Sequence, residues 1–211
     1  MPYLQSISKE VKEMWSLVLS QHQKSLTALS DFDKDLAREI ILIEERVNSS
    51  EQFIESDCEN YFSLENTGPG AVSFVMYILK ITRRLEIMGD LAKKIANEIL
   101  KTNSRFNNQL LTTINIMELF KKSNQVLELS SDAFNQNDHS VAQLTQARIH
   151  VFRDMASETN YLLVRHLDEN PQDLDEALNL FSIIETLKRV ADLAHSICES
   201  ILHNDTAEIT A

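Results

Sequence analysis

Residues 78–99 read ILKITRRLEIMGDLAKKIANEI, and this stretch decides the fold. Its apolar residues recur at alternating steps of three and four, at positions 78, 81, 85, 88, 92, 95 and 99. This spacing is typical of the buried seam of an α-helix that packs lengthwise on its neighbours. Residues 180–201, LFSIIETLKRVADLAHSICESI, carry the same seam. The sequence therefore predicts two long amphipathic helices.

These two helices are copies of one pattern. Pro69 precedes Asp90 by 21 residues and Pro171 precedes Asp192 by 21 residues, so an offset of 102 residues relates both pairs. Under this offset seven apolar positions are identical, namely 81, 85, 91, 92, 95, 99 and 100. A matched proline and a matched aspartate indicate duplication more strongly than shared apolar positions do. We predict two tandem copies, residues 1–103 and 104–211, with a single irregular six-helix bundle as the alternative.

The scarcity of turn residues predicts few, long elements. The chain has three Gly and three Pro among 211 residues, and these are the residues that tight turns need most. Turn signals divide the chain into six stretches of about 30 residues, long for globular helices. Short links between long helices make neighbours antiparallel. The expected fold is all-α: two tandem antiparallel three-helix bundles with six long helices.

Composition narrows the class of partner and the compartment. The net charge of −12 argues against nucleic acid, because a phosphate backbone repels an acidic surface. No apolar run is long enough to span a bilayer, and residues 1–5 lack the features of a signal peptide. Cys58 and Cys198 stand alone in helical patterns, which is typical of buried thiols in a reducing compartment. We expect a cytoplasmic protein without direct membrane insertion.

An acidic pair lies on the third predicted helix. Glu86 and Asp90 are four residues apart and therefore share one helix face. On the seam count they lie beside and opposite the buried stripe, so we expect both to face water. Like charges at this spacing cost roughly 0.2–0.5 kcal/mol in an isolated helix. A sequence with such a pair either tolerates this cost or uses the pair to hold a cation.

The order of these features resembles the PhoU family of phosphate-uptake regulators. Residues 84–92, RLEIMGDLA, are similar to the family hallmark L-E-R-I-G-D-x-A-x-N-I-A-E, and residues 188–194, KRVADLA, to its second copy. Upstream, residues 35–37 (DLA) and 44–48 (EERVN) are similar to the pattern of the family's second helix. The resemblance covers nearly the whole chain, and its specificity comes from the order and spacing of the motifs together.

The resemblance implies both a fold and a function. Members are tandem three-helix-bundle proteins that restrain phosphate uptake and phosphate-starvation signalling. They act between the ATPase subunit of a phosphate transporter and a membrane sensor kinase. The resemblance thus implies a cytoplasmic adaptor that reaches the inner membrane through its partners, and we also expect a homodimer. In several members, acidic pairs of the second and third helices of each half hold iron- or zinc-type clusters.

Carried onto this chain, the metal site is most complete in the first half. Glu44 corresponds to the first acid of the second helix, and Asn48 stands in place of its partner acid. Glu86 and Asp90 match the pair on the third helix, while Lys94 replaces an asparagine of the family pattern. The resemblance implies iron or zinc at Glu44, Asn48, Glu86 and Asp90, with fewer charges than usual. A solvated acidic face is the alternative.

The second half departs further from the family pattern. Arg153 occupies an acid position of its second helix, and Lys188 replaces the first acid of its third helix, which leaves Asp192. We predict that Arg153 or Lys188 pairs with Asp192 or Glu199, so that the protein supplies positive charge itself. Asp192 and Glu199 are the remaining metal candidates there, with His195 between them. A histidine at the surface without a metal is the alternative.

No catalytic pattern is present. The sequence lacks a Gly-rich phosphate loop, a nucleophile elbow and an H-E-x-x-H motif, so we expect no enzyme, no catalytic residue and no organic cofactor. Two alternatives stay open. One is an acidic-face metal hydrolase that gathers two ions at Glu44, Glu86 and Asp90. The other is a generic helical scaffold that serves a different transporter client.

Overall fold

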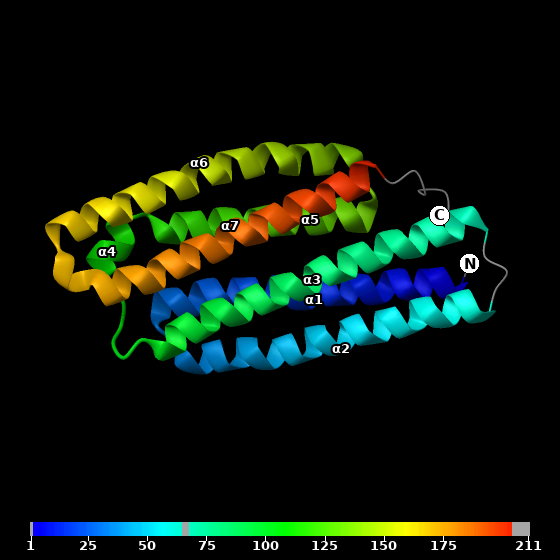
Figure 1. Cartoon of the computed structure of the whole chain (residues 1–211), viewed down its shortest axis with the longest axis horizontal. Coiled ribbons are helices and arrows are strands. Elements are labelled where there is room, and N and C mark those ends of the chain that lie inside the picture. The colour runs from blue at the N-terminus through cyan, green and yellow to red at the C-terminus, as the bar shows by residue number, and fades with distance from the viewer. Residues whose placement is uncertain (1, 65–67, 204–211) are drawn as a thin grey trace.

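The protein, seen in a computed structural model that describes residues 2–64 and 68–203, is all-helical in that part of the chain. The first half consists of α1 (Pro2–Asp31), α2 (Lys34–Leu64) and α3 (Pro69–Lys101). The second half contains α5 (Ile116–Gln136), α6 (His139–Glu169) and α7 (Leu174–Leu202). Successive long helices run antiparallel in both halves (Figure 1). The predicted fold class, two tandem antiparallel three-helix bundles, is confirmed.

The fourth predicted helix is divided into two, which sequence analysis missed. A short helix, α4 (Asn108–Thr113), ends before Asn115, whose φ is 55°, and α5 begins at the next residue. Asn137, with a φ of 48°, ends α5 in the same way. Asparagine tolerates this left-handed backbone better than most residues. The expectation of one long helix was wrong because a single asparagine between Ile114 and Ile116 gives a weaker turn signal than the clusters of Gly, Pro, Asn, Asp or Ser that placed the other turns. A 3-10 turn, η1 (Pro171–Asp173), leads into α7.

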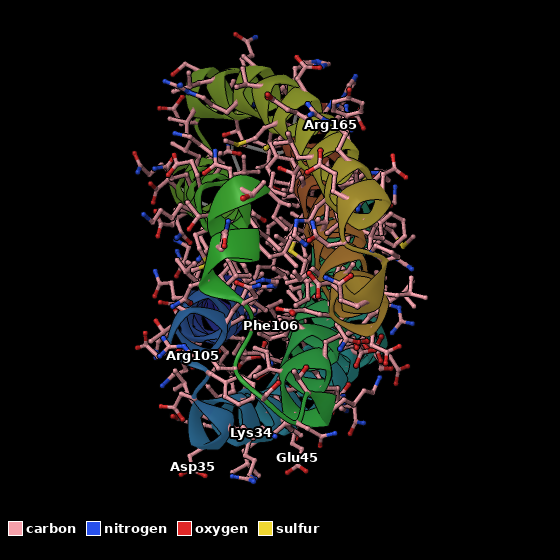
Figure 2. All side chains as sticks on the ribbon, turned by 90° about the vertical axis from the view of Figure 1, so that its left-hand side faces the viewer. Lys34, Asp35, Glu45, Arg105, Phe106 and Arg165 are labelled. Carbon is pink, nitrogen blue, oxygen red and sulfur yellow. The ribbon has the colours of Figure 1, made fainter. Side chains whose placement is uncertain are left out.

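The link between the halves is fixed to the end of the first bundle. The ring of Phe106 is 2% exposed and meets Phe32 edge to face, with centroids 6.2 Å apart. Arg105 donates to the carbonyl oxygen of Ser30 at 2.8 Å. Lys34 donates to the carbonyl oxygens of Leu100 and Thr102 at the end of α3. Figure 2 shows Lys34, Arg105 and Phe106 at the same end of the molecule. The domain boundary at 103/104 falls in this link and stays a prediction; residue 1 and residues 204–211 lie outside the described residues.

The two halves pack lengthwise on each other. α1 packs against α5 and α3 against α7, and α2 and α6 lie on opposite outer sides (Figure 1). Every seam residue of α3 and α7 that the periodicity predicted is at most 1% exposed. Cys58 and Cys198 are buried free thiols, as expected, and burial raises the pKa of Cys58 to about 12. Within the described ranges, no helix is both long and apolar enough to cross a bilayer.

Close helix packing occurs where α3 carries its acidic pair. A Cβ on Gly89 would lie 3.0 Å from Val47 Cγ1 on α2 and 3.3 Å from Gln21 Oε1 on α1. Beside it, the fully buried ring of His22 has Nε2 3.0 Å from the carbonyl oxygen of Met88. Burial lowers the pKa of His22 to about 4. The glycine therefore lets three helices meet closely, and this brings the charged residues of α2 and α3 together.

Candidate functional site

Glu44 lies at the centre of the predicted first-half site. Its side chain is 2% exposed between α2 and α3. Lys93 donates to Glu44 Oε2 at 2.8 Å, and Asn48 donates to Glu44 Oε1 at 2.7 Å. The hydrogen bond to Glu44 raises the pKa of Lys93. Each oxygen of this carboxylate therefore has a donor from the protein itself.

Glu86 is buried rather than facing water, which corrects the expectation from the seam count. The residue is 9% exposed, whereas Asp90 is exposed as expected. Arg83 lies 3.0 Å from Glu86 Oε2 and donates to Glu51 of α2 at 3.2 Å. Burial raises the pKa of Glu86, and the nearby charge of Glu51 adds to this, while Arg83 opposes it. The seam count failed because it follows one buried face, whereas α2 covers a second face of α3.

The first-half residues, as they are arranged, fit an internal ion-pair network better than an iron or zinc cluster. Lys93 and Arg83 already place positive charge beside Glu44 and Glu86. A metal ion bound to Glu44 would meet the charge of Lys93 at close range. Across residues 2–64 and 68–203, no three His, Cys, Asp or Glu side chains gather in a metal-binding arrangement. Metal binding at Glu44, Asn48, Glu86 and Asp90 stays a prediction.

The ion pair predicted for the second half is confirmed. Arg153 of α6 donates to Asp192 Oδ1 of α7 from Nη2 at 2.7 Å and from Nε at 3.2 Å. Lys188 instead pairs with Glu185, at 2.8 Å, and Asn160 donates to the same carboxylate at 2.9 Å. Burial alone would raise the pKa of Glu185, but the hydrogen bonds from Lys188 and Asn160 outweigh it and lower that pKa.

The second-half metal candidates have different neighbours. Asp192 faces Arg153, whereas Glu199 Oε2 lies 3.6 Å from Nδ1 of His195. Seven residues separate Asp192 and Glu199 on α7, which is about 10 Å along a helix. The structure therefore does not bring the two carboxylates together around one point, and their binding of a metal also stays a prediction.

Sequence reasoning missed five members of these networks: Glu51, Arg83, Lys93, Asn160 and Glu185. The repeat offset carried a usable signal, because Arg83 and Glu86 correspond to Glu185 and Lys188 with the charges exchanged. Lys93 follows Glu86 by seven residues, which places both on one helix face two turns apart. Such a pattern predicts compensating charges rather than a bare acidic stripe.

The fold and these networks define a class of proteins: tandem three-helix bundles with polar, charged residues between the second and third helices of each half. A family model described as the PhoU domain matches residues 11–99 and again residues 116–201. The chain belongs to the PhoU family.

Relatives and solved structures agree with this assignment. The phosphate-specific transport system accessory protein PhoU of Escherichia coli (strain K12) is 26% identical over 206 residues, covering 95% of this chain and 82% of that protein. The crystal structure of PhoU from Pseudomonas aeruginosa aligns with a TM-score of 0.86 at 21% identity, covering 96% of each chain. A phosphate transport system regulatory protein PhoU from Streptococcus pneumoniae aligns with a TM-score of 0.83 at 23% identity, covering 99% and 97% of the two chains.

Proposed function

We propose that this chain is an accessory protein of a phosphate transport system that restrains phosphate uptake and phosphate-starvation signalling. One observation carries the proposal: two PhoU domains match in tandem, one in each half of the chain. Relatives that align with 95% of the chain are named as accessory proteins of phosphate-specific transport. The function therefore follows from an alignment along nearly the whole length rather than from one motif.

In this proposal the protein acts as a cytoplasmic adaptor, as a homodimer, at the inner face of the membrane. Its partners are the ATPase subunit of the transporter and a membrane sensor kinase. Apolar side chains on the outer helices are available for docking, including Leu42 at 60%, Val151 at 59% and Tyr161 at 62% exposure. The net charge of −12 favours a basic partner surface.

The adaptor role also requires that the protein does not turn over a substrate. The hydrolase alternative needs Glu44, Glu86 and Asp90 free to gather two metal ions, and Lys93 and Arg83 compete for the first two. A phosphatase assay with added zinc, iron or manganese separates the alternatives. We expect no metal-dependent turnover. Turnover that disappears in Glu44→Gln would instead support the hydrolase.

Deletion of the gene in its own host tests the proposal, with phosphate uptake and a phosphate-starvation reporter measured in phosphate-rich medium. We expect uptake and reporter to rise on deletion and to return to normal when the chain is supplied again. In parallel, the tagged chain should recover the transporter ATPase subunit and the kinase from solubilised membranes. Unchanged uptake, together with recovery of a different transporter, would support the generic scaffold and contradict the proposal.

A further inference from the structure

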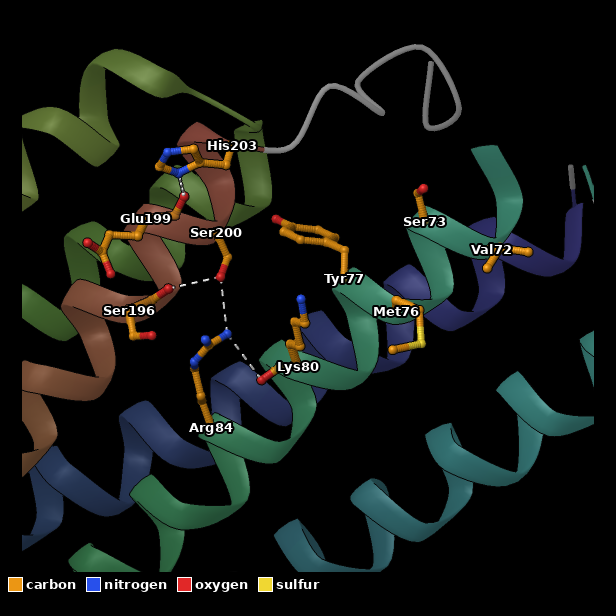
Figure 3. Close-up of a pocket in the computed structure, with 10 residues that line it drawn as sticks. All are labelled: Val72, Ser73, Met76, Tyr77, Lys80, Arg84, Ser196, Glu199, Ser200 and His203. Atoms are coloured by element: carbon orange, nitrogen blue, oxygen red, sulfur yellow. Dashed lines mark hydrogen bonds between the residues drawn. The ribbon is translucent and has the colours of Figure 1, made fainter. Parts of the chain in front are cut away.

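A cavity of about 790 Å³ lies between α3 and α7, where the two halves of the chain meet. Tyr77, Lys80 and Arg84 line it from α3, and Ser196 and Ser200 line it from α7. Figure 3 shows Arg84 directed from α3 toward Ser200 of α7 and Lys80 directed away from α3 into the space beside Tyr77. The cavity is separate from the network between α2 and α3, because the neighbouring Arg83 contacts Glu51 of α2.

Arg84 is held in place at the wall of this cavity. Its Nη1 donates to Ser200 Oγ at 3.1 Å and to the carbonyl oxygen of Lys80 at 3.4 Å. Ser200 Oγ in turn donates to the carbonyl oxygen of Ser196 at 2.9 Å, which orients it to accept from the arginine. A guanidinium has five N–H donors in a planar fork, so donors on its other nitrogens remain for a ligand.

The cavity concentrates positive charge in an acidic protein. Lys80 and Arg84 lie one helical turn apart, and within the described residues neither forms an ion pair. Like charges at this spacing repel each other. Partial burial lowers the pKa of Arg84, and the negative charge of Glu199 offsets this lowering only in part. Glu199 lines the same cavity, and His195 lies beside it. An anion between the two cations would relieve both the repulsion and the loss of solvation.

We propose that this cavity binds a phosphate monoester, with the phosphoryl group between Lys80 and Arg84. Arginine matches phosphate oxygens through paired hydrogen bonds, and lysine adds a point charge. The volume exceeds what inorganic phosphate needs and lies within the usual range for small-molecule sites. Val72, Met76 and Tyr77 line the same cavity and offer apolar contact to the organic part of the ester. The inference does not depend on the transport role.

Isothermal titration calorimetry of the full-length protein at low salt tests the site, with AMP as the probe and adenosine as its uncharged match. We expect AMP to bind saturably and adenosine not to bind. Arg84→Gln should weaken AMP binding by about tenfold or more. Arg189→Gln is the matched control, because Arg189 is exposed on α7, does not line the cavity and makes the same charge change. Circular dichroism checks that both variants keep their helices.

A second arm distinguishes the source of the phosphate group. Phosphatidylcholine vesicles that contain phosphatidic acid present a phosphate monoester as a lipid headgroup. Vesicles of phosphatidylcholine alone, which is a phosphodiester, are the control. Binding to phosphatidic acid that depends on Arg84, without AMP binding, supports the site and assigns its ligand to lipid. Inorganic phosphate should bind more weakly than AMP. Three results would overturn the proposal. AMP affinity could fall equally in Arg84→Gln and Arg189→Gln, or adenosine could bind as tightly as AMP. The third result is that neither AMP nor phosphatidic acid binds.

Discussion

The two halves of the molecule place ion pairs at equivalent positions but with the charges reversed. On α3, Arg83 precedes Glu86 by three residues and lies 3.0 Å from it. At the equivalent positions of α7, Glu185 precedes Lys188 and lies 2.8 Å from it. An ion pair at this spacing is compatible with the helix in either order. The duplication therefore gives each half a charged face. The sign of the charge at equivalent positions differs between the halves, and so the two faces can bind different groups.

Burial differs between the halves as well. In the first half, the side chain of Glu44 is 2% exposed and pairs with Lys93 at 2.8 Å. In the second half, Arg153 and Asp192 are 39% and 60% exposed. A buried carboxylate without its partner is costly, whereas an exposed pair contributes little because water and salt screen it. We therefore expect the first half to be sensitive to loss of a single charged or polar partner and the second half to tolerate it.

The largest expected change in the free energy of unfolding comes from His22 as the pH falls. Among the described histidines only His22 is buried, and its pKa is about 4 in the folded protein against 6.5 for an unperturbed histidine. Between these values the unfolded chain binds a proton and the folded chain does not. Stability should fall by about 3 kcal/mol as the pH drops from 6.5 to 4.

Urea unfolding of the wild type and of His22→Gln at pH 7 and pH 4.5 isolates this effect from that of the carboxylates. The variant should lose less stability than the wild type on acidification. Equal losses in the two proteins would show that His22 is not held neutral in the first bundle.

The second largest loss of stability is expected from Lys93→Met, which leaves Glu44 buried without its cation. The free energy of unfolding should fall by about 2 kcal/mol, less than for a fully buried pair because Lys93 is partly exposed. Chemical denaturation at pH 7 measures this loss. The double variant Lys93→Met with Glu44→Gln should recover part of it. A loss within error of zero would mean that solvent reaches Glu44.

Arg153→Met provides the matched change in the second half. Because Arg153 and Asp192 are both exposed, the loss should be at most about 1 kcal/mol and should shrink as salt is added. Thermal unfolding at low and high salt measures it. A loss as large as that of Lys93→Met would remove the distinction between the halves.

The arrangement of long helices could be predicted from the sequence, because helices that pack lengthwise have apolar residues at regular steps of three and four. The seams of α3 and α7 and the duplication followed from spacing, whereas the pair between Arg153 and Asp192 followed from the resemblance to the family together with charge. The break at Asn115 was missed because a left-handed asparagine leaves a weaker signal than glycine or proline. The burial of Glu86 was missed because it depends on how closely α2 approaches α3, which Gly89 permits.

Metal affinity tests most directly whether the protein supplies its own positive charge between α2 and α3. Zinc or ferrous iron is titrated into the metal-free wild type and into Lys93→Gln, with Glu44→Gln as the control. The account predicts weak binding by the wild type and binding about tenfold tighter in Lys93→Gln, because Glu44 then lacks its cation. Tight, stoichiometric binding by the wild type that Glu44→Gln abolishes would contradict it.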